Sequence, residues 1–172
     1  WIHGGAFEMG GTIDPMYDLH NFVNENPDVI TVAITYRLGV FGFFHLSHLS
    51  DGKDYPDAQN LGIMDQIMAL KWVHENIAAF GGAPENVTIS DESAGAGSLT
   101  VLSLIEGSHK YFKRVIAQSG APSLSRFTEQ AVRCTNTLMD ILGCKTVANL
   151  QKVDVEKFIE ASKVIALRVA PE

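Results

Sequence analysis

The sequence has little cysteine and a deficit of positive charge. It carries two Cys, and 13 Lys and Arg against 20 Asp and Glu give a formal net charge of −7. Nucleic-acid-binding surfaces need clustered positive charge, and no cluster of Lys or Arg occurs here, so we expect no nucleic-acid partner. No apolar run reaches the roughly 20 residues that a membrane-spanning helix needs, so no membrane segment is predicted.

The positions of the two cysteines argue against a disulfide. Residues 135–143, between Cys134 and Cys144, have a helical pattern, and ten residues of helix separate their ends by roughly 15 Å. That distance is beyond disulfide reach, so we expect two buried free thiols. Neither the cysteines nor any other feature indicates a localisation or an oligomeric state.

What the sequence does contain is an alternation of β-branched runs and segments of helical periodicity. Hydrophobic residues make up 46% of the chain, enough for one sizeable core. Strands are expected at 29–36, 87–90 and 113–120, and helices at 17–25, 61–80, 99–105, 128–142, 147–152 and 155–168. This order predicts an α/β fold with a mostly parallel central sheet flanked by helices, forming one domain over residues 1–172.

Three of these segments allow more detailed predictions. Val29–Tyr36 is rich in β-branched residues without strong alternation, which predicts a central strand buried on both faces. Residues 37–56 contain glycines, aromatics and a polar end at Ser50–Asp54, so they are expected to form a long surface excursion. Apolar residues at spacings of three and four predict a long amphipathic helix over Leu61–Phe80, ended by glycine, with the stripe Ile63, Ile67, Leu70, Val73, Ile77 and Phe80.

Ser93 stands where a predicted strand gives way to a helix. Val87–Ser98 opens with β-favouring residues and leads into a helical pattern, which predicts strand, sharp turn and helix. In the nucleophile elbow of α/β-hydrolases such a turn strains the serine and exposes its hydroxyl. The next N–H, that of Ala94, would lie at a helix N-terminus that favours an oxyanion. Ser93 is therefore the candidate nucleophile, and the alternative is a plain helix N-cap.

The elbow pattern is G-x-S-x-G, and Asp91 stands in place of its first glycine. We expect this aspartate to strain the close packing of strand and helix and to place a second carboxylate near the serine.

A glycine-rich segment precedes this turn. Trp1–Phe7 contains the pattern HGGxF, upstream of the serine, where a hydrolase of this fold keeps its other oxyanion donors. Consecutive glycines let the backbone turn its N–H groups toward a ligand without side-chain obstruction. Such a strand exit can also be a plain turn, but the two motifs occur in the order that the hydrolase interpretation requires.

His45 and His48 have a spacing that a metal site could use. No further cluster of ligands lies nearby in the sequence, so we expect solvated loop histidines. No metal or cofactor is implied.

Six segments carry a family resemblance: Trp1–Phe7, Tyr36–Gly39, Asn60–Gln66, Asn76–Gly82, Glu92–Ala96 and Gln118–Gly120. In these segments, which run in family order to about Pro122, the chain resembles the type-B carboxylesterases of the α/β-hydrolase superfamily, which include cholinesterases and bacterial para-nitrobenzyl esterases. The resemblance implies an α/β-hydrolase fold, present in part, and a serine carboxylic-ester hydrolase (EC 3.1.1.-) that acts on a small-molecule ester through an acyl-enzyme. The spacing of Cys134 and Cys144 departs from the cholinesterase disulfide loops and points to the bacterial branch.

The same resemblance implies roles for single residues. Ser93 is the nucleophile, and the oxyanion hole consists of the backbone N–H groups of Gly5, Ala6 and Ala94. Glu92 matches an acidic residue that tunes the electrostatics of the active-site gorge, and Ser119 matches a serine that supports the triad acid. The remaining match is a structural ion pair, Arg37 with Asp65.

The rest of the triad is expected outside residues 1–172, which we interpret as an internal piece of a longer protein whose further strands flank this sheet. The triad order in this fold is Ser, acid, His, and family members place the last two farther beyond the serine than this chain extends. His109 follows the elbow helix too soon to return over Ser93. The later acids lie on helical patterns where a solvated face is expected: Glu129, Asp140, Asp154, Glu156 and Glu160.

Two other functions fit the same pattern. One is a non-catalytic cholinesterase-like binding or adhesion module, which keeps the fold without the chemistry. The other is an amidase or carbamate hydrolase, because these substrates pass through the same kind of intermediate.

Overall fold

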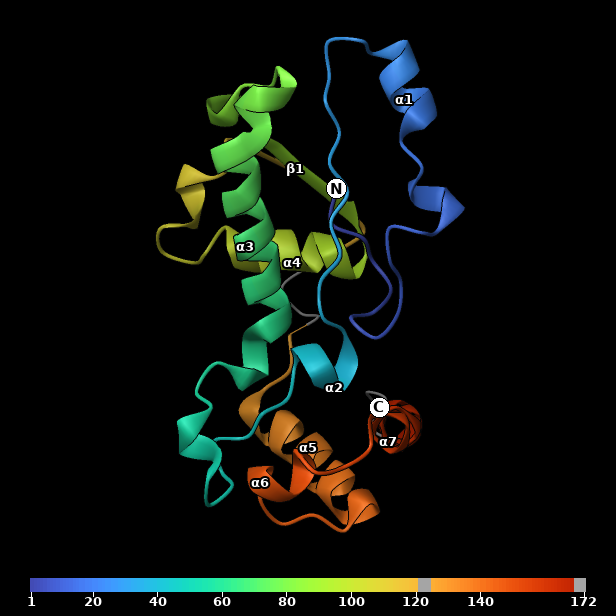
Figure 1. Cartoon of the computed structure of the whole chain (residues 1–172), viewed down its shortest axis with the longest axis vertical. Helices are drawn as coiled ribbons and strands as arrows, with labels where there is room; N and C mark the ends of the chain where they lie inside the picture. The colour runs from blue at the N-terminus through green and yellow to red at the C-terminus, as the bar shows by residue number, and fades with distance from the viewer. Residues whose placement is uncertain (121–124, 169–172) are drawn as a thin grey trace. The chain divides into compact units, whose positions relative to one another are not determined.

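The computed structural model describes residues 1–120 and 125–168, with side chains through residue 165. The chain folds as two compact units (Figure 1). Unit 1 comprises Trp1–Leu38 and Gly62–Ser125, and unit 2 comprises Gly39–Leu61 and Arg126–Glu172. All predicted site residues belong to unit 1. We keep the single domain over residues 1–172 as a proposal, and Pro122, at the end of the family match, lies outside the described residues.

Unit 1 is built on parallel extended segments. Strand β1 (Thr88–Glu92) pairs in parallel with β2 (Arg114–Gln118), with Asp91 opposite Ala117. The first residues of the chain extend the sheet beyond β1, because the Ile2 N–H donates to the Ser90 carbonyl at 3.3 Å and the Ile34 N–H donates to the Trp1 carbonyl at 3.1 Å. The predicted parallel sheet is therefore confirmed.

The predicted central strand over Val29–Tyr36 is only partly present. A single parallel bridge joins Ile34 to Ile2, and Val29 and Ile30 are 40% and 45% exposed. Burial on both faces was therefore a wrong prediction for the start of this segment. The physical reason is that, within the described residues, the segment pairs as a strand only with Trp1 and Ile2, near its C-terminal end.

Helix α3 (Leu61–Asn76) confirms most of the predicted long helix, and its chain continues as the 3₁₀ turn η4 (Ile77–Phe80) up to Gly81, whose φ is +85°. Four of the six predicted apolar positions are buried, namely Ile63, Leu70, Val73 and Ile77. Phe80 is 64% exposed, against the prediction, because a 3₁₀ turn has three residues per turn and rotates its last residue off the α-helical stripe.

The remaining elements of unit 1 are short, apart from α4 (Ala94–Leu102), which packs against both β1 and β2. The helix predicted at 17–25 is divided into η1 (Pro15–Tyr17) and α1 (His20–Glu25). Two further 3₁₀ turns are η5 (Pro84–Asn86) and η6 (Ser108–Lys110).

Unit 2 contains the three predicted C-terminal helices, α5 (Thr128–Leu142), α6 (Val147–Leu150) and α7 (Val155–Arg168), together with α2 (Gly39–Gly42), η2 (Gly52–Asp54) and η3 (Ala58–Asn60). Phe44 and Leu46 are buried in one core with α5, α6 and α7. Residues 37–56 are thus not only a surface excursion, because the aromatic and aliphatic side chains among them cover the inner faces of these helices.

Both cysteines are free, as predicted, but they are half-buried instead of buried.

His45 lies between Gln59 Oε1, 2.6 Å from its Nδ1, and Ser47 Oγ, 2.9 Å from its Nε2. Among the described residues no group of three or more His, Cys, Asp or Glu could hold a metal ion. Within the same residues, every helix is too short or too polar to cross a membrane.

The predicted ion pair of Arg37 and Asp65 is present. The Asp65 carboxylate accepts the Arg37 backbone N–H at 3.0 Å and the guanidinium Nε and Nη2 at 2.7 Å each. These bonds from Arg37 lower the pKa of Asp65. The two side chains are 48% and 26% exposed, so the pair contributes less to stability than a buried pair would.

We predict that Asp65→Asn in the intact protein lowers the free energy of unfolding by about 1–2 kcal/mol at pH 7. The folded pKa of Asp65 lies below its unfolded value of about 3.9, so the stabilisation is present above that value and is lost as the pH falls through the folded pKa. Urea denaturation at pH 7 and in acid measures both effects. The control is Glu75→Gln, which removes a 3.8 Å pair with Lys71 and should cost below about 0.5 kcal/mol. Equal losses for the two variants at pH 7 would contradict the prediction.

Candidate active site

Ser93 is the single residue between β1, which ends at Glu92, and α4, which begins at Ala94. Its backbone has φ +59° and ψ −123°, a conformation that costs a non-glycine residue on the order of 1–3 kcal/mol. The predicted strand, sharp turn and helix are confirmed. The Ser93 side chain makes no capping hydrogen bond to α4, so the plain N-cap alternative loses its main support.

Backbone contacts fix this turn from the side of β2. The Ser93 N–H donates to the Gln118 carbonyl at 2.9 Å, and the Gly97 N–H donates to the Ser93 carbonyl at 3.0 Å. A methyl group on Gly120 would overlap the Ser93 carbonyl oxygen and lie 2.8 Å from the Gly97 nitrogen. Residue 120 must therefore be glycine for the chain after β2 to reach the elbow. The only sequence signal for this role is the family match at Gln118–Gly120.

The glycine-rich segment lies against the same turn. A Cβ on Gly4 would stand 2.8 Å from the Glu92 carbonyl oxygen and 3.4 Å from Ser93 Cβ. Beyond Gly4 the chain reverses through three residues of positive φ, at +110° for Gly5, +57° for Ala6 and +62° for Phe7. The consecutive glycines predicted a backbone turn here, but nothing in the sequence predicted that Ala6 and Phe7 would also adopt the left-handed conformation.

The backbone N–H groups of Gly5, Ala6 and Ala94 have no hydrogen-bond acceptor among the described residues. The Gly5 carbonyl, in contrast, accepts two N–H groups, those of Glu8 and Met9, at 3.0 Å each. Ala94 is the first residue of α4, so its N–H shares the positive end of the helix dipole. These donors can receive a ligand oxygen, and their assignment as an oxyanion hole stays a prediction.

Two supporting residues predicted by resemblance lie where parallel strands end. Glu92 is the last residue of β1, with an exposed side chain. Ser119 follows β2 directly, is exposed and has a φ of +54°. The carboxyl ends of parallel strands share one edge of a sheet, which is where open α/β folds bind ligands. The structure thus places both residues at the same edge as Ser93 and leaves their roles untested.

The carboxylate expected near the serine is present, but it is buried. Asp91 has no exposed surface, and its side chain lies on Gly95, in the first turn of α4. Burial raises its pKa to about 7, and the Glu92 N–H, which donates to Asp91 Oδ1, acts in the opposite direction. Within the described residues, Asp91 Oδ2 has no hydrogen-bond partner.

A second buried polar side chain, that of His3, contacts the backbone of the glycine segment. His3 is 1% exposed, its Nδ1 lies 2.8 Å from the Gly4 carbonyl oxygen, and its ring stacks on Tyr36 at 4.6 Å. The Tyr36 hydroxyl donates to the His3 carbonyl at 2.7 Å. These contacts give His3 a structural place in the loop, which the pattern HGGxF did not specify.

No triad partner of Ser93 is found in the described residues. None of their histidines forms a hydrogen bond with Ser93. His109 is exposed on η6, with its ring 5.9 Å from that of Phe112. The predicted solvated faces are confirmed, because all five later acids are exposed: Glu129, Asp140, Asp154, Glu156 and Glu160.

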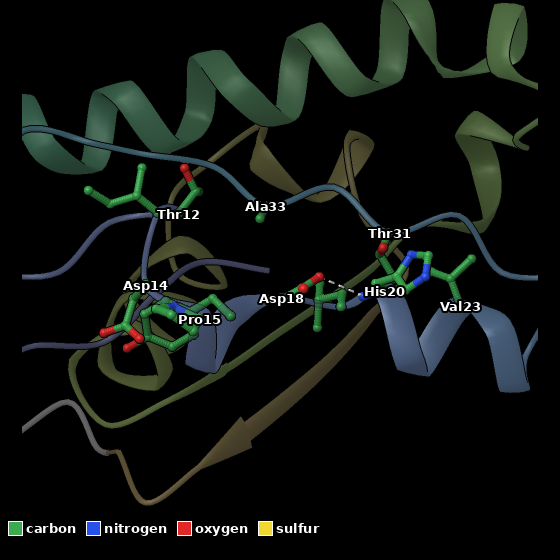
Figure 2. Close-up of a pocket in the computed structure, with 11 residues that line it drawn as sticks. Thr12, Asp14, Pro15, Asp18, His20, Val23, Thr31 and Ala33 are labelled. Atoms are coloured by element: carbon green, nitrogen blue, oxygen red, sulfur yellow. Dashed lines mark hydrogen bonds between the residues drawn. The ribbon is translucent and has the colours of Figure 1, made fainter.

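An open hollow of about 630 Å³ lies elsewhere in unit 1 (Figure 2). Its walls are residues 12–15, 17–20 and Val23 on one side and Thr31 and Ala33 on the other. Figure 2 shows the Asp18 carboxylate at the start of α1, where it accepts the His20 N–H at 3.0 Å. None of the predicted site residues lines this hollow, so it is not the candidate active site.

We predict that Gly4→Ala in the intact protein lowers the free energy of unfolding by about 1–3 kcal/mol, because the new methyl group overlaps the Glu92 carbonyl oxygen. The matched control is Gly11→Ala, where an added methyl meets nothing within 4 Å. That variant should stay within about 0.5 kcal/mol of the parent. Denaturant titration of both variants checks the difference, and similar stabilities would show that Gly4 does not pack against the elbow.

Comparison with known proteins assigns the fold. The model of the carboxylesterase family matches residues 1–170. The para-nitrobenzyl esterase of Bacillus subtilis is 41% identical over 172 residues, which are 99% of this chain and 34% of that protein. Mouse cholinesterase is 39% identical over 157 residues, 89% of this chain and 25% of its own length.

The solved structures that resemble this chain are also carboxylesterases. A crystal structure of a Geobacillus stearothermophilus carboxylesterase matches with a TM-score of 0.90 at 44% identity, over 96% of this chain and 36% of the other. The chain therefore spans roughly a third of the length of these bacterial relatives. The α/β-hydrolase fold, present in part, is confirmed, as is the resemblance: the chain belongs to the carboxylesterase family.

Proposed function

We propose that the protein to which this chain belongs is a serine hydrolase that cleaves small-molecule carboxylic esters through an acyl-enzyme intermediate. The observation that carries the proposal is the backbone of Ser93, held at φ +59° between β1 and α4 with Gly4 against its Cβ. A structural serine has no need of this conformation. Strained backbone of this kind persists where the surrounding structure enforces it, most often at functional sites.

The reaction follows from this geometry. Ser93 Oγ attacks the ester carbonyl carbon and gives its proton to a base, and the carbonyl oxygen gains negative charge. The N–H groups of Gly5, Ala6 and Ala94 donate to that oxyanion, where preorganised donors are worth several kcal/mol of barrier, about 2.7–4 for a single donor in a measured case. The alcohol then leaves with a proton, and water hydrolyses the acyl-serine to release the acid and restore the hydroxyl.

We predict that Ser93→Ala in the intact protein lowers kcat for a short-chain aryl ester by a factor of about 10⁴–10⁶, as loss of a triad nucleophile does. It should also abolish labelling by a fluorophosphonate probe. The control is Ser103→Ala, because Ser103 Oγ donates only to Leu99 O of its own helix at 2.8 Å. That variant should keep turnover and labelling.

The same experiment separates the rival function. A binding or adhesion module would show neither turnover nor labelling in the parent protein. Labelling at a residue other than Ser93 would contradict the proposal in a different way, because it would leave an active hydrolase with another nucleophile.

We further propose that the triad acid and His lie outside residues 1–172. Two observations support this: no histidine of the described residues bonds to Ser93, and the chain spans roughly a third of its bacterial relatives. The triad runs Ser, acid, His in this fold, so its histidine must follow Ser93 in the sequence. His109 is the one histidine of the chain that does so, which makes it the residue to test.

We predict that His109→Gln leaves kcat of the intact enzyme within about tenfold of the parent, since loss of a triad base costs about 10⁴–10⁶. Steady-state kinetics with the same aryl ester gives the answer. A loss of the larger size with an unchanged unfolding midpoint would place the base within this chain and contradict the proposal.

A further inference from the structure

Asp91 is the most deeply buried ionisable side chain at the elbow, and the proposed reaction does not use it. It stands on β1, two residues before Ser93, with no exposed surface. Its neighbours on α4 and β2 are small or apolar: Gly95 under the carboxyl group and Ala117 across the strand pair.

The contacts of its two oxygens differ. Asp91 Oδ1 accepts the backbone N–H of Glu92. Asp91 Oδ2 has no hydrogen-bond partner among the described residues. A methyl group on Gly95 would meet both Asp91 Oδ2 and the carbonyl oxygen of Ile2, so these two oxygens converge on one small space and lie within hydrogen-bonding reach of each other.

Two buried acceptor oxygens repel each other unless one carries a proton. A carbonyl cannot carry one, whereas a protonated carboxyl group is a hydrogen-bond donor. An unpaired anion in a fully buried site would also bear a large desolvation penalty. The geometry therefore favours the protonated form of Asp91, with its O–H directed at the Ile2 carbonyl.

We propose that Asp91 is a positioning residue that works as a neutral carboxylic acid. It donates to the Ile2 carbonyl and accepts the Glu92 N–H, so it links the strand that leads into the glycine loop to the strand that leads into Ser93. The link is lost when Asp91 ionises. Its effect on activity rests on the proposed function, but its effect on stability does not.

The titratable groups around Asp91 act on this equilibrium. Burial raises the pKa of Asp91 to about 7, and the neighbouring Glu92 carboxylate raises it as well, whereas the Glu92 N–H lowers it. Tyr17 and Tyr36 also face Asp91, and burial raises the pKa of both phenols, so they stay neutral in the same range. His3 follows Ile2 in the sequence, and α4 brings no titratable group.

The sign of the pH dependence follows from the raised pKa. Between the unfolded value of about 3.9 and the folded value of about 7, the folded state holds a proton that the unfolded state has released. The contribution of Asp91 to stability is therefore fully present below about pH 4, falls as the pH rises, and is lost above about pH 7. The opposite sign is expected for an exposed or ion-paired carboxylate.

The test compares Asp91→Asn with Asp91→Ala in the intact protein. The amide of Asn keeps a donor for Ile2 and an acceptor for Glu92 and cannot ionise, whereas Ala removes both. At pH 4, where the contribution of Asp91 is still nearly complete, we expect the Asn variant to melt close to the parent and the Ala variant to melt below both. From pH 6 to pH 8.5 the parent should lose stability relative to the Asn variant. The control is Glu75→Gln, an exposed carboxylate, whose difference from the parent should not change over this range.

The second readout is the rate at which a fluorophosphonate labels Ser93. The ratio of Asn variant to parent should rise by up to about tenfold between pH 6 and pH 8, since a group of pKa near 7 goes from mostly protonated to mostly ionised. Taking the ratio cancels the titration of the catalytic base, which both proteins share.

Each outcome decides the proposal. An Asn variant as unstable as the Ala variant at pH 4, or parallel stability profiles of parent and Asn variant from pH 6 to pH 8.5, would overturn it. The expected stability profiles with no labelling in any protein would leave the acid link standing and refute the proposed function instead.

Discussion

Close packing of backbone against backbone around Ser93 is the constraint on which the site depends. The glycine loop reaches the elbow at Gly4, the chain after β2 reaches it at Gly120, and the first turn of α4 passes under it at Gly95. At each position a methyl group would collide with a backbone or carboxyl oxygen. The positive φ of Ser93 costs on the order of 1–3 kcal/mol, and this enclosure keeps the residue there.

The loop that carries the proposed Gly5 and Ala6 donors is also held in place by buried side chains. Buried His3 and Tyr36 hold two successive carbonyls of this loop: His3 Nδ1 lies 2.8 Å from the Gly4 oxygen, and the Tyr36 hydroxyl donates to the His3 oxygen. Donors that are already oriented need little reorganisation during the reaction, which is the main source of oxyanion stabilisation. His3 and Tyr36 therefore hold the glycine loop in the conformation that the proposed reaction requires.

Local patterns predicted the parts of the fold that local forces decide. Helical periodicity placed α3, α5 and α7, and the change from β-branched to small residues placed the turn at Ser93. The errors concern contacts between distant segments: Phe44 and Leu46 are buried by helices more than 80 residues later in the chain, and Val29 and Ile30 are partly exposed because they have no strand partner among the described residues. The burial of Asp91 against Ile2 is likewise a long-range contact that no local pattern announces.

Trapping the intermediate tests the central claim most directly. The intact protein is mixed with a para-nitrophenyl ester, quenched in acid within the first turnover, digested, and its peptides are weighed by mass spectrometry. The account predicts that one peptide gains the mass of the acyl group, that fragmentation places this mass on Ser93, and that the gain disappears as turnover is completed. Ester cleavage with no acylated peptide, or with the acyl group on another residue, would contradict it.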